Sequence, residues 1–173
     1  INIAKKYIKN GDIFQVVPSQ RFETKYTGSV LKLYQALRKT NPSPFMYYFN
    51  FPRFKIVGSS PEILVRLRNK KITIRPIAGT RPRGGTKKLD NKYAEDLLKD
   101  KKEIAEHLML LDLGRNDVGR VANKSSVKVT SEFEIERYSH VMHIVSNVEG
   151  KVLSDKTAFE ALMAGFPAGT VSG

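Results

Sequence analysis

DKKEIAEH, residues 100–107, is an acidic stretch that runs directly into the apolar residues Leu108–Leu111. In a helix, Glu103 and Glu106 lie three positions apart, so both carboxylates point the same way. Two like charges on one face repel, and the spacing therefore indicates a cation between them; carboxylate oxygens suit Mg²⁺. The same spacing is also typical of a solvated helix face whose glutamates pair with nearby lysines. Those lysines are Lys99, Lys101 and Lys102.

The bulk composition is that of a globular domain. The chain has 173 residues, of which 40% are apolar and 9% aromatic, enough to bury a core. It has no cysteine, which excludes a disulfide scaffold, thiolate catalysis and cysteine zinc sites. No apolar run is long enough to span a bilayer, and no secretory signal is visible, so we expect no membrane partner.

Positive charge is concentrated in the front half. The net charge is +13, and residues 1–90 hold 19 Lys and Arg against 4 Asp and Glu. A basic surface can meet nucleic acid, an anionic metabolite or an acidic partner subunit. The lysines are scattered and few adjoin aromatic residues, so the stacking platforms of nucleic-acid binders are not evident. We expect no nucleic-acid partner, and a basic nucleic-acid-binding module remains the alternative of a different class.

Helical and strand patterns alternate without a βαβ rhythm, which predicts an α+β fold with antiparallel sheets packed against outer helices. Predicted helices end at Asn10-Gly11, run from a Ser29 cap to Arg38, cover about Tyr93–Leu111, and run from a Ser154 cap to about Ala164. Predicted strands cover Ile13–Val17, Phe45–Phe51, Lys55–Gly58, Ile63–Arg68, Ile72–Ile77, Val127–Val129, Phe133–Arg137 and Val141–Val148. Predicted loops cover Ala78–Gly85 and Arg115–Arg120.

The Gly/Pro/Arg segment Pro76–Gly84 follows a predicted strand. Glycine allows close backbone approach, and Thr80 and the arginines can bind a carboxylate. A hairpin turn with solvated arginines is the alternative interpretation.

The stretch Ser139–Ser146 contains His140 and His143, which face opposite sides if the stretch is a strand. A half-buried His143 can act as a general base, or it can be a core histidine bonded to backbone. Glu62 follows a tight turn; it is either a surface residue at the start of a strand or, if buried, a candidate acid.

Taken together and in order, these segments resemble the chorismate-utilising enzymes, in particular the anthranilate synthase component I branch. The resemblance spans nearly the whole chain, and a collinear series of this kind is far more specific than any single motif. The matching stretches are Gly11–Phe22, Asn41–Met46, Ser60–Glu62, Pro76–Gly84, Lys102–His107, Asp112–Val121, Ser139–Ser146 and Gly169–Gly173.

The resemblance implies a Mg²⁺-dependent conversion of chorismate and ammonia to anthranilate and pyruvate, the first committed step of tryptophan biosynthesis. It implies that Mg²⁺ holds the ring carboxylate of chorismate, with Glu106 as a direct ligand and Glu103 assisting. Glu62 would protonate the departing hydroxyl, and His143 would be the catalytic histidine. The implied substrate-contacting residues are Gly79, Thr80 and Thr170.

Two positions distinguish the branches of the family. Isochorismate and salicylate synthases carry a lysine base where this chain has Gln15, so the resemblance favours ammonia as nucleophile and makes Gln15 a catalytic candidate. Aminodeoxychorismate synthases often carry a nucleophilic lysine where this chain has Ala78. Both positions favour anthranilate formation; aminodeoxychorismate synthase, of the folate branch, is the alternative.

The resemblance also implies partners. Ammonia would come from a glutamine amidotransferase subunit, and feedback tryptophan would contact Pro44, Phe45 and Met46, although the same loop also serves as a proline-stiffened connection. Residues 1–173 would form the central part of a chorismate-binding catalytic domain, with its N-terminal regulatory part and its C-terminal end absent. We expect such a piece, with an incomplete fold, to be inactive alone and the enzyme to be cytoplasmic, a plastid being the alternative.

Overall fold

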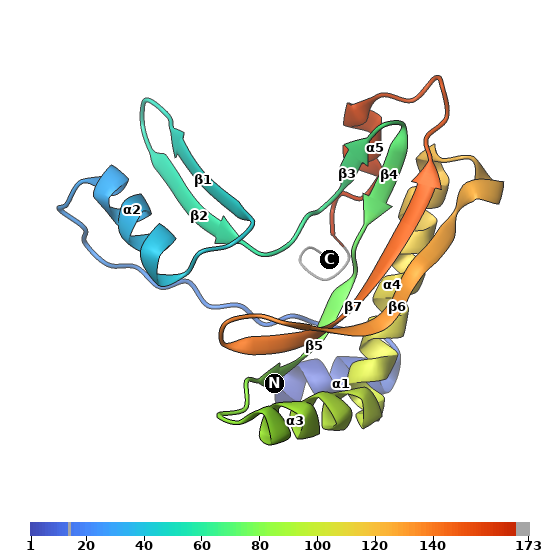
Figure 1. Cartoon of the computed structure of the whole chain (residues 1–173), viewed down its shortest axis with the longest axis horizontal. Helices are drawn as coiled ribbons and strands as arrows, with labels where there is room; N and C mark the ends of the chain where they lie inside the picture. The colour runs from blue at the N-terminus through green and yellow to red at the C-terminus, as the bar shows by residue number, and fades with distance from the viewer. Residues whose placement is uncertain (14, 169–173) are drawn as a thin grey trace. The chain divides into compact units, whose positions relative to one another are not determined.

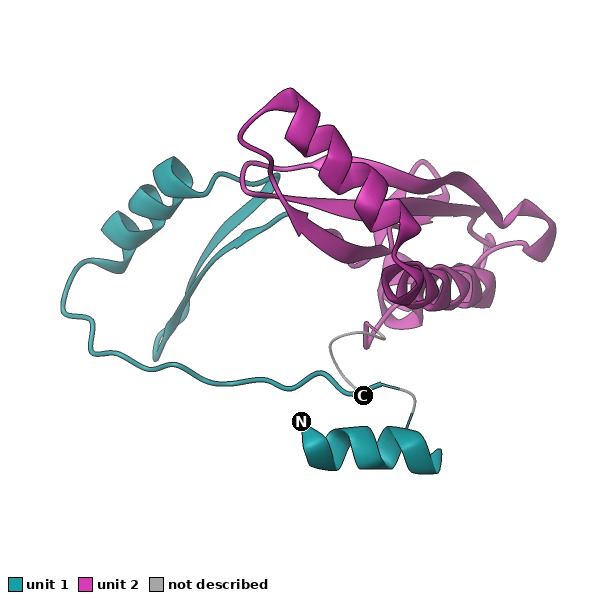
Figure 2. Ribbon diagram, turned by 90° about the horizontal axis from the view of Figure 1, so that it is seen from below, with its two compact units in different colours: residues 1–61, 170–173 teal, residues 62–169 magenta. Residues whose placement is uncertain are grey.

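The computed structural model describes residues 1–13 and 15–168. The chain divides into two compact units, the first ending at Pro61 and the second beginning at Glu62 (Figure 2). Among the described residues, no helix is both long and apolar enough to cross a bilayer.

The first unit holds two helices and a hairpin: α1 (Asn2–Asn10), α2 (Val30–Thr40), β1 (Phe45–Asn50) and β2 (Lys55–Ser60). As predicted, α1 ends at Gly11, whose φ of 80° is a left-handed conformation that suits glycine. The strand predicted for Ile13–Val17 is wrong: of these residues, 13 and 15–17 are described and belong to no strand. Their β-branched side chains fit a strand, but the described residues give them no ladder partner.

In the hairpin of the first unit, β1 and β2 pair antiparallel from Phe45↔Ser60 to Asn50↔Lys55. One face of the hairpin meets α2, where the Tyr34 and Tyr48 rings lie 6.0 Å apart. The opposite face carries alternate aromatic residues, among them Tyr47 and Phe49, which are exposed. The alternation of side chains along a strand produces these two faces.

The second unit is built on a five-stranded antiparallel sheet (Figure 1). Its strands are β3 (Arg66–Arg68), β4 (Lys71–Ile74), β5 (Ile77–Pro82), β6 (Lys128–Arg137) and β7 (Val141–Lys151). The long strand β7 pairs with β4 near its C-terminal end, with β5 near its N-terminal end, and with β6 along its length. This arrangement of antiparallel strands and helices confirms the predicted α+β class.

The helices of the second unit are α3 (Lys87–Lys99), α4 (Lys101–Val121), the short 3₁₀ helix η1 (Lys124–Ser126) and α5 (Ala158–Ala164). Helix α4 packs against β4, β5, β6 and β7. The core between α4, α5 and the sheet includes fully buried Ile72, Val118 and Val148. A second buried cluster joins α3 to β7 through Leu97, Met142 and Ile144. The core thus fixes α4 along the sheet.

The single helix predicted for Tyr93–Leu111 is two helices that meet at Asp100. The Asp100 carboxylate accepts hydrogen bonds from the backbone N–H groups of Lys102 (3.0 Å) and Glu103 (3.2 Å), so it caps α4. The loop predicted for Arg115–Arg120 is also wrong, because α4 continues to Val121. Its polar residues occupy the outer face while Val118 is buried.

Other boundaries differ for local reasons. The predicted loop Ala78–Gly85 contains strand β5, because its backbone pairs with β7 despite the glycine and prolines. Predicted strand Ile63–Arg68 shrinks to three residues, and Val65 packs on the core instead of joining a ladder. The final helix is capped by Thr157, not Ser154: Thr157 and Glu160 form a reciprocal capping box.

Candidate functional site

The predicted carboxylate pair lies in the first turns of α4, where the helix dipole favours negative charge. The Glu103 side chain is 16% exposed and that of Glu106 is 28% exposed. The Lys102 ammonium lies 3.1 Å from a Glu103 oxygen and 3.3 Å from a Glu106 oxygen. The ion pairing considered from the sequence is therefore confirmed for Lys102, whereas Lys99 lies 4.0 Å from Glu95. The Lys102 ammonium thus bridges the two carboxylates in this structure.

Gly79 lies directly beside Glu103. Its φ is 78°, and a β-carbon added there would come within 3.3 Å of Glu103 Oε2 and 3.2 Å of Leu97 Cδ1. The β5–β7 register shifts between Ala78 and Thr80, so the chain bulges at Gly79. Only glycine combines this backbone conformation with so close an approach to the carboxylate.

The imidazole of His143 is held by β5. Strand β7 places His143 opposite Thr80, whose Oγ1 lies 3.1 Å from His143 Nδ1. The same Nδ1 lies 3.1 Å from the carbonyl oxygen of Gly79. Because a carbonyl oxygen can only accept, this contact places the proton on Nδ1 and leaves the Nε2 lone pair available as a base. The predicted half-buried position of His143 is confirmed.

Tyr138 lies between β6 and β7, close to His143, and Glu62 acts on it electrostatically. The Tyr138 ring lies 5.5 Å from the His143 ring. Burial, followed by the hydrogen bond to Glu136, raises the pKa of Tyr138 to about 12, and the charge of Glu62 contributes in the same direction. Glu62 is exposed, so the burial on which its role as an acid was conditional is not observed.

The arginines after Gly79 bind carboxylates of the protein itself. Arg81 pairs with Asp96 and Asp100, each at 2.8 Å, and these hydrogen bonds raise the pKa of Arg81. Arg83 pairs with buried Asp90 at 2.8 Å. The arginines thus bind carboxylates, as predicted, but the carboxylates belong to the protein itself. These ion pairs connect β5 to α3 and to Asp100, the N-cap of α4.

Gln15, Pro44, Phe45 and Met46 belong to the first unit. There the Ser59 hydroxyl donates to the Asn41 carbonyl (2.7 Å) and bonds Ser43 Oγ (2.9 Å), which ties the proline loop to β2; Phe45 begins β1. Thr170 lies outside the described residues. His140 precedes β7 and is exposed.

His107 and Ser146 form a buried polar contact that was not predicted from the sequence. His107 is fully buried one helical turn after Glu103, and its Nε2 lies 2.7 Å from Ser146 Oγ. Burial lowers the pKa of His107, and the backbone of Ala78 opposes that shift. His107 and Ser146 are 39 residues apart in the sequence, so no local pattern predicted their contact. The available signal was that His107 lies four residues after Glu103.

A metal site would rest on the two α4 carboxylates. Within residues 1–13 and 15–168, no group of three or more His, Asp or Glu side chains is arranged to hold a metal ion. Two carboxylates match the ligand set of Mg²⁺, which commonly takes one or two protein carboxylates and fills its other positions with water and substrate oxygens. The donor set therefore fits Mg²⁺ bound together with an anionic ligand.

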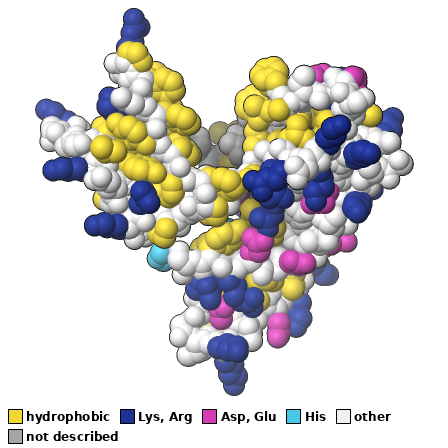
Figure 3. Space-filling view, turned by 45° about the horizontal axis from the view of Figure 1, so that its top comes forward, with side chains coloured by type: hydrophobic (Ala, Val, Ile, Leu, Met, Phe, Trp, Pro, Cys, Tyr) yellow, Lys and Arg dark blue, Asp and Glu magenta, His cyan; other side chains and the backbone are white. Residues whose placement is uncertain are grey.

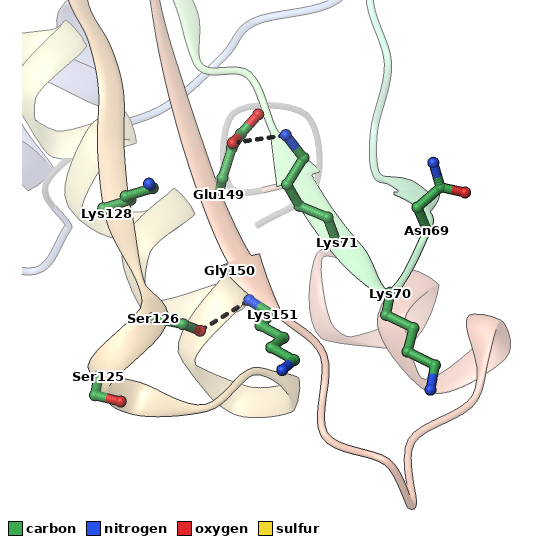
Figure 4. A pocket seen from close by; sticks show the side chains of 9 residues that line it. All are labelled: Asn69, Lys70, Lys71, Ser125, Ser126, Lys128, Glu149, Gly150 and Lys151. Carbon is green, nitrogen blue, oxygen red and sulfur yellow. Dashed lines mark hydrogen bonds and ion pairs between the residues drawn. The ribbon is translucent and has the colours of Figure 1, made fainter.

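A separate basic pocket of about 540 Å³ lies near the other end of β7 (Figure 4). It contains a Lys71–Glu149 ion pair of 3.0 Å, and the Lys151 N–H donates to Ser126 Oγ at 2.8 Å. Along β7, Gly150 lies roughly 24 Å from His143 at the usual rise per residue. The pocket is therefore separate from the part of β7 and β5 where His143, Thr80 and Gly79 lie. Its lining residues are Asn69, Lys70, Lys71, Ser125, Ser126, Lys128, Glu149, Gly150 and Lys151.

The second unit thus belongs to a class of α+β proteins in which the acidic end of a helix packs beside a bulged strand of an antiparallel sheet, and an imidazole on the next strand bonds the backbone of that bulge. A family model described as chorismate binding enzyme matches residues 1–173. The chain belongs to the chorismate binding enzyme family, as its sequence predicted.

Individual relatives agree with this assignment. The chain is 64% identical over 170 residues to "Anthranilate synthase component 1" of Cereibacter sphaeroides, a match that covers 98% of this chain and 34% of the relative. It is 60% identical to the protein of the same name from Synechocystis, with 100% and 35% covered. The chain thus spans about a third of the length of these relatives.

Solved structures give the same fold. The crystal structure of anthranilate synthase component I from Streptococcus pneumoniae matches with a TM-score of 0.90 and 47% identity, covering 99% of this chain and 38% of that one. An isochorismate synthase structure from Bacillus anthracis, at 23% identity and a TM-score of 0.68, shares the fold over 79% of this chain.

Proposed function

We propose that this chain forms part of an anthranilate synthase component I, which converts chorismate and ammonia to anthranilate and pyruvate. One observation carries the proposal: a chain 64% identical to such a protein has Glu103 beside Gly79, and Thr80 and the Gly79 carbonyl beside His143, where β5 pairs with the N-terminal part of β7. These residues are separated by up to 64 positions in the sequence. A basic binding module would not require this convergence.

In this proposal the α4 carboxylates would hold Mg²⁺, with Glu106 as a direct ligand and Glu103 assisting. The metal would neutralise the ring carboxylate of chorismate. Glu103 lies against the Gly79 backbone, so the carboxylate pair and the β5 bulge would face the same ligand. Within this arrangement, Lys102 would compete with the metal for the same oxygens.

His143 would act as the base for the ring proton during loss of pyruvate. Its Nδ1 is held by the Gly79 carbonyl, so Nε2 is the atom that would take the proton. Thr80 and Gly79 would contact the substrate beside it, and Thr170 is proposed for the same role. Glu62, near Tyr138, is proposed as the acid that protonates the departing ring hydroxyl.

The remaining assignments are also proposals. Gln15, in place of a water-activating lysine, would favour ammonia as nucleophile. The relatives' designation as component 1 supports a second component, for which we propose a glutamine amidotransferase that supplies ammonia. Inhibition by tryptophan at Pro44, Phe45 and Met46, and a cytoplasmic location, stay predictions.

We further propose that residues 1–173 are the central part of a chorismate-binding catalytic domain. The described residues supply one carboxylate pair and no third acidic or histidine ligand, so we expect this chain alone to make no anthranilate. Fluorescence detection of anthranilate from the purified 173-residue chain, supplied with chorismate, ammonium and Mg²⁺, tests this. Turnover would show that the chain contains a complete site.

The proposed function is tested with the full-length protein. Purified protein receives chorismate, ammonium chloride and Mg²⁺, and the products are identified by chromatography and mass. Anthranilate and pyruvate in equal amounts are expected. Aminodeoxychorismate as the product would instead support the folate-branch alternative, and isochorismate would show that water is the nucleophile and that the interpretation of Gln15 is wrong.

A further inference from the structure

Beneath the proposed site, helix α4 and strand β7 are joined by a polar contact in an otherwise apolar core. The His107 and Ser146 side chains are both fully buried, and His107 Nε2 lies 2.7 Å from Ser146 Oγ. The His107 ring lies 5.0 Å from the Phe133 ring, and Leu110 of the same helix and Ile144 of the same strand are also buried. An aliphatic residue would fill this position without the cost of burying an imidazole.

The contact extends to a third element, strand β6. Strand β6 shifts register between Ser131 and Glu134, so Glu132 and Phe133 both oppose Ser146. Phe133 has a φ of 52°, and its N–H donates to Ser146 Oγ at 3.0 Å instead of to the ladder. A hydroxyl can bond both the imidazole and the N–H group. We call His107, Ser146 and the Phe133 N–H the polar bridge.

One atom of the polar bridge is not satisfied in the ordinary way. His107 Nδ1 is buried and has no hydrogen bond of normal geometry within the described residues, so the backbone of Ala78 is at most a weak hydrogen-bond partner of the imidazole. A buried polar atom left in this way is unfavourable, so such sites call for an explanation other than stability. Packing alone does not explain an imidazole here.

The polar bridge adjoins each element of the proposed site. His107 follows Glu106 directly and lies one turn from Glu103, on the same face of α4. Ser146 lies three residues after His143 on β7. Ala78, whose backbone opposes the lowering of the His107 pKa, directly precedes Gly79 and Thr80 on β5. In an α-helix one residue corresponds to a rotation of about 100°. A directional bond at His107 therefore adds to the core packing of α4 a constraint on the direction in which the two glutamates point.

We propose that His107 and Ser146 are positioning residues, which hold α4 at the rotation that sets the Glu103 carboxylate against Gly79 and keeps the Glu106 carboxylate beside it. This inference rests on the proposed function, because the carboxylates are assigned to Mg²⁺ there. Neither residue is placed in contact with substrate. In some proteins, buried polar contacts of this kind specify one arrangement of packed elements where apolar contacts allow several.

The test uses the full-length protein and the variants His107→Leu, His107→Gln and Ser146→Ala. Leucine removes the polar bridge, whereas the glutamine amide can replace Nε2 as a partner of Ser146. Val118→Ala is the matched control, because Val118 is a fully buried residue of the same helix that packs in the core away from Gly79. Two quantities are measured: Mg²⁺ affinity by calorimetry with chorismate and no ammonia, and kcat at saturating Mg²⁺.

His107→Leu and Ser146→Ala are expected to weaken Mg²⁺ binding roughly tenfold or more, as loss of supporting contacts around metal ligands does. His107→Gln should recover most of the Mg²⁺ affinity. Val118→Ala should lower thermal stability and leave the Mg²⁺ affinity unchanged. If His107→Leu only lowers stability, as the control does, the positioning role is wrong. If His107→Leu fails to fold, His107→Gln and Ser146→Ala decide alone, and unchanged affinity in Ser146→Ala overturns the inference.

Failure of the proposed function would be recognised separately. A wild-type protein that binds Mg²⁺, loses affinity in the variants and makes no anthranilate would contradict the reaction but support the positioning role. A wild-type protein whose anthranilate formation does not depend on Mg²⁺ would contradict the metal assignment and this inference together.

Discussion

Gly79 shows how one residue can link backbone conformation to the chemistry of the site. Its positive φ permits the β5 bulge, its missing side chain makes room for Glu103, and its carbonyl holds His143. Close approach by a glycine in this segment was predicted from the sequence. That the neighbour approached is Glu103 was not predicted, because it depends on the packing of α4 against β5.

Substitution of Gly79 by alanine should therefore damage both stability and activity. A left-handed conformation costs a non-glycine residue about 1–2 kcal/mol, and the added carbon would press on Glu103 and Leu97. Urea unfolding and anthranilate formation by the full-length protein measure the two effects. Gly85→Ala is the control, because nothing lies within 4 Å of a carbon added there. Equal behaviour of the two variants would contradict the close packing at Gly79.

Asp90 provides a pH-dependent prediction. Its carboxylate is buried and bonds Arg83, the Gly84 N–H and Arg137; Arg83 contributes most to holding the pKa of Asp90 well below its usual range. Because the folded-state pKa is lowered, this contribution is complete above the pKa of an unfolded aspartate, about 4. It is lost as the pH falls from there toward the folded-state pKa.

Asp90→Asn should accordingly be less stable than wild type near pH 7, and the difference should narrow as the pH falls below about 4, where aspartate is protonated in unfolded chains. Urea unfolding at a series of pH values measures it. Asp155→Asn, at a carboxylate whose side chain is 72% exposed, serves as the control. A gap between Asp90→Asn and wild type that stays constant down to pH 2 would show that the ion pairs at Asp90 do not contribute.

At the scale of elements, the sequence predicted which segments are regular better than where they end. The α3–α4 break was missed because Leu97 and Ile104, seven residues apart, are in phase with one helix across the charged residues 99–103. The decisive signal was the capping carboxylate of Asp100. Strand β5 was missed because glycine and proline usually mark turns. Pairing with β7 outweighed that local preference. The core residues of β7 were predictable, since alternation and β-branched residues agree with burial.

The cap of α5 allows a direct test at this scale. Thr157 Oγ1 accepts the Glu160 N–H, and Glu160 accepts the Thr157 N–H in return. Thr157→Ala should lower the free energy of unfolding by about 1 kcal/mol, the usual loss for an N-cap. Ser154→Ala, at the residue that the sequence favoured as the cap, should change it little. The reverse order in chemical denaturation would mean that the helix begins at Ser154.

At the scale of the whole molecule, two properties were accessible from the sequence and one was not. The α+β class and family membership followed from patterns that span the chain. The scattered distribution of basic residues expected from the sequence is also seen. On the face shown in Figure 3, Lys and Arg side chains lie among acidic and apolar ones and do not form one tract. The polar bridge was not accessible, because nothing local relates residue 107 to residue 146.

The central claim is that the α4 carboxylates hold the Mg²⁺ that binds chorismate, and a magnesium titration of anthranilate formation tests it most directly. The full-length protein is compared with Glu106→Gln and with Glu95→Gln, a control at an exposed carboxylate of α3. We predict that Glu95→Gln retains the wild-type half-saturating Mg²⁺ concentration, while Glu106→Gln loses at least 99% of its activity, about 2.7 kcal/mol of transition-state stabilisation. Wild-type turnover and an unchanged magnesium dependence in Glu106→Gln would contradict the claim.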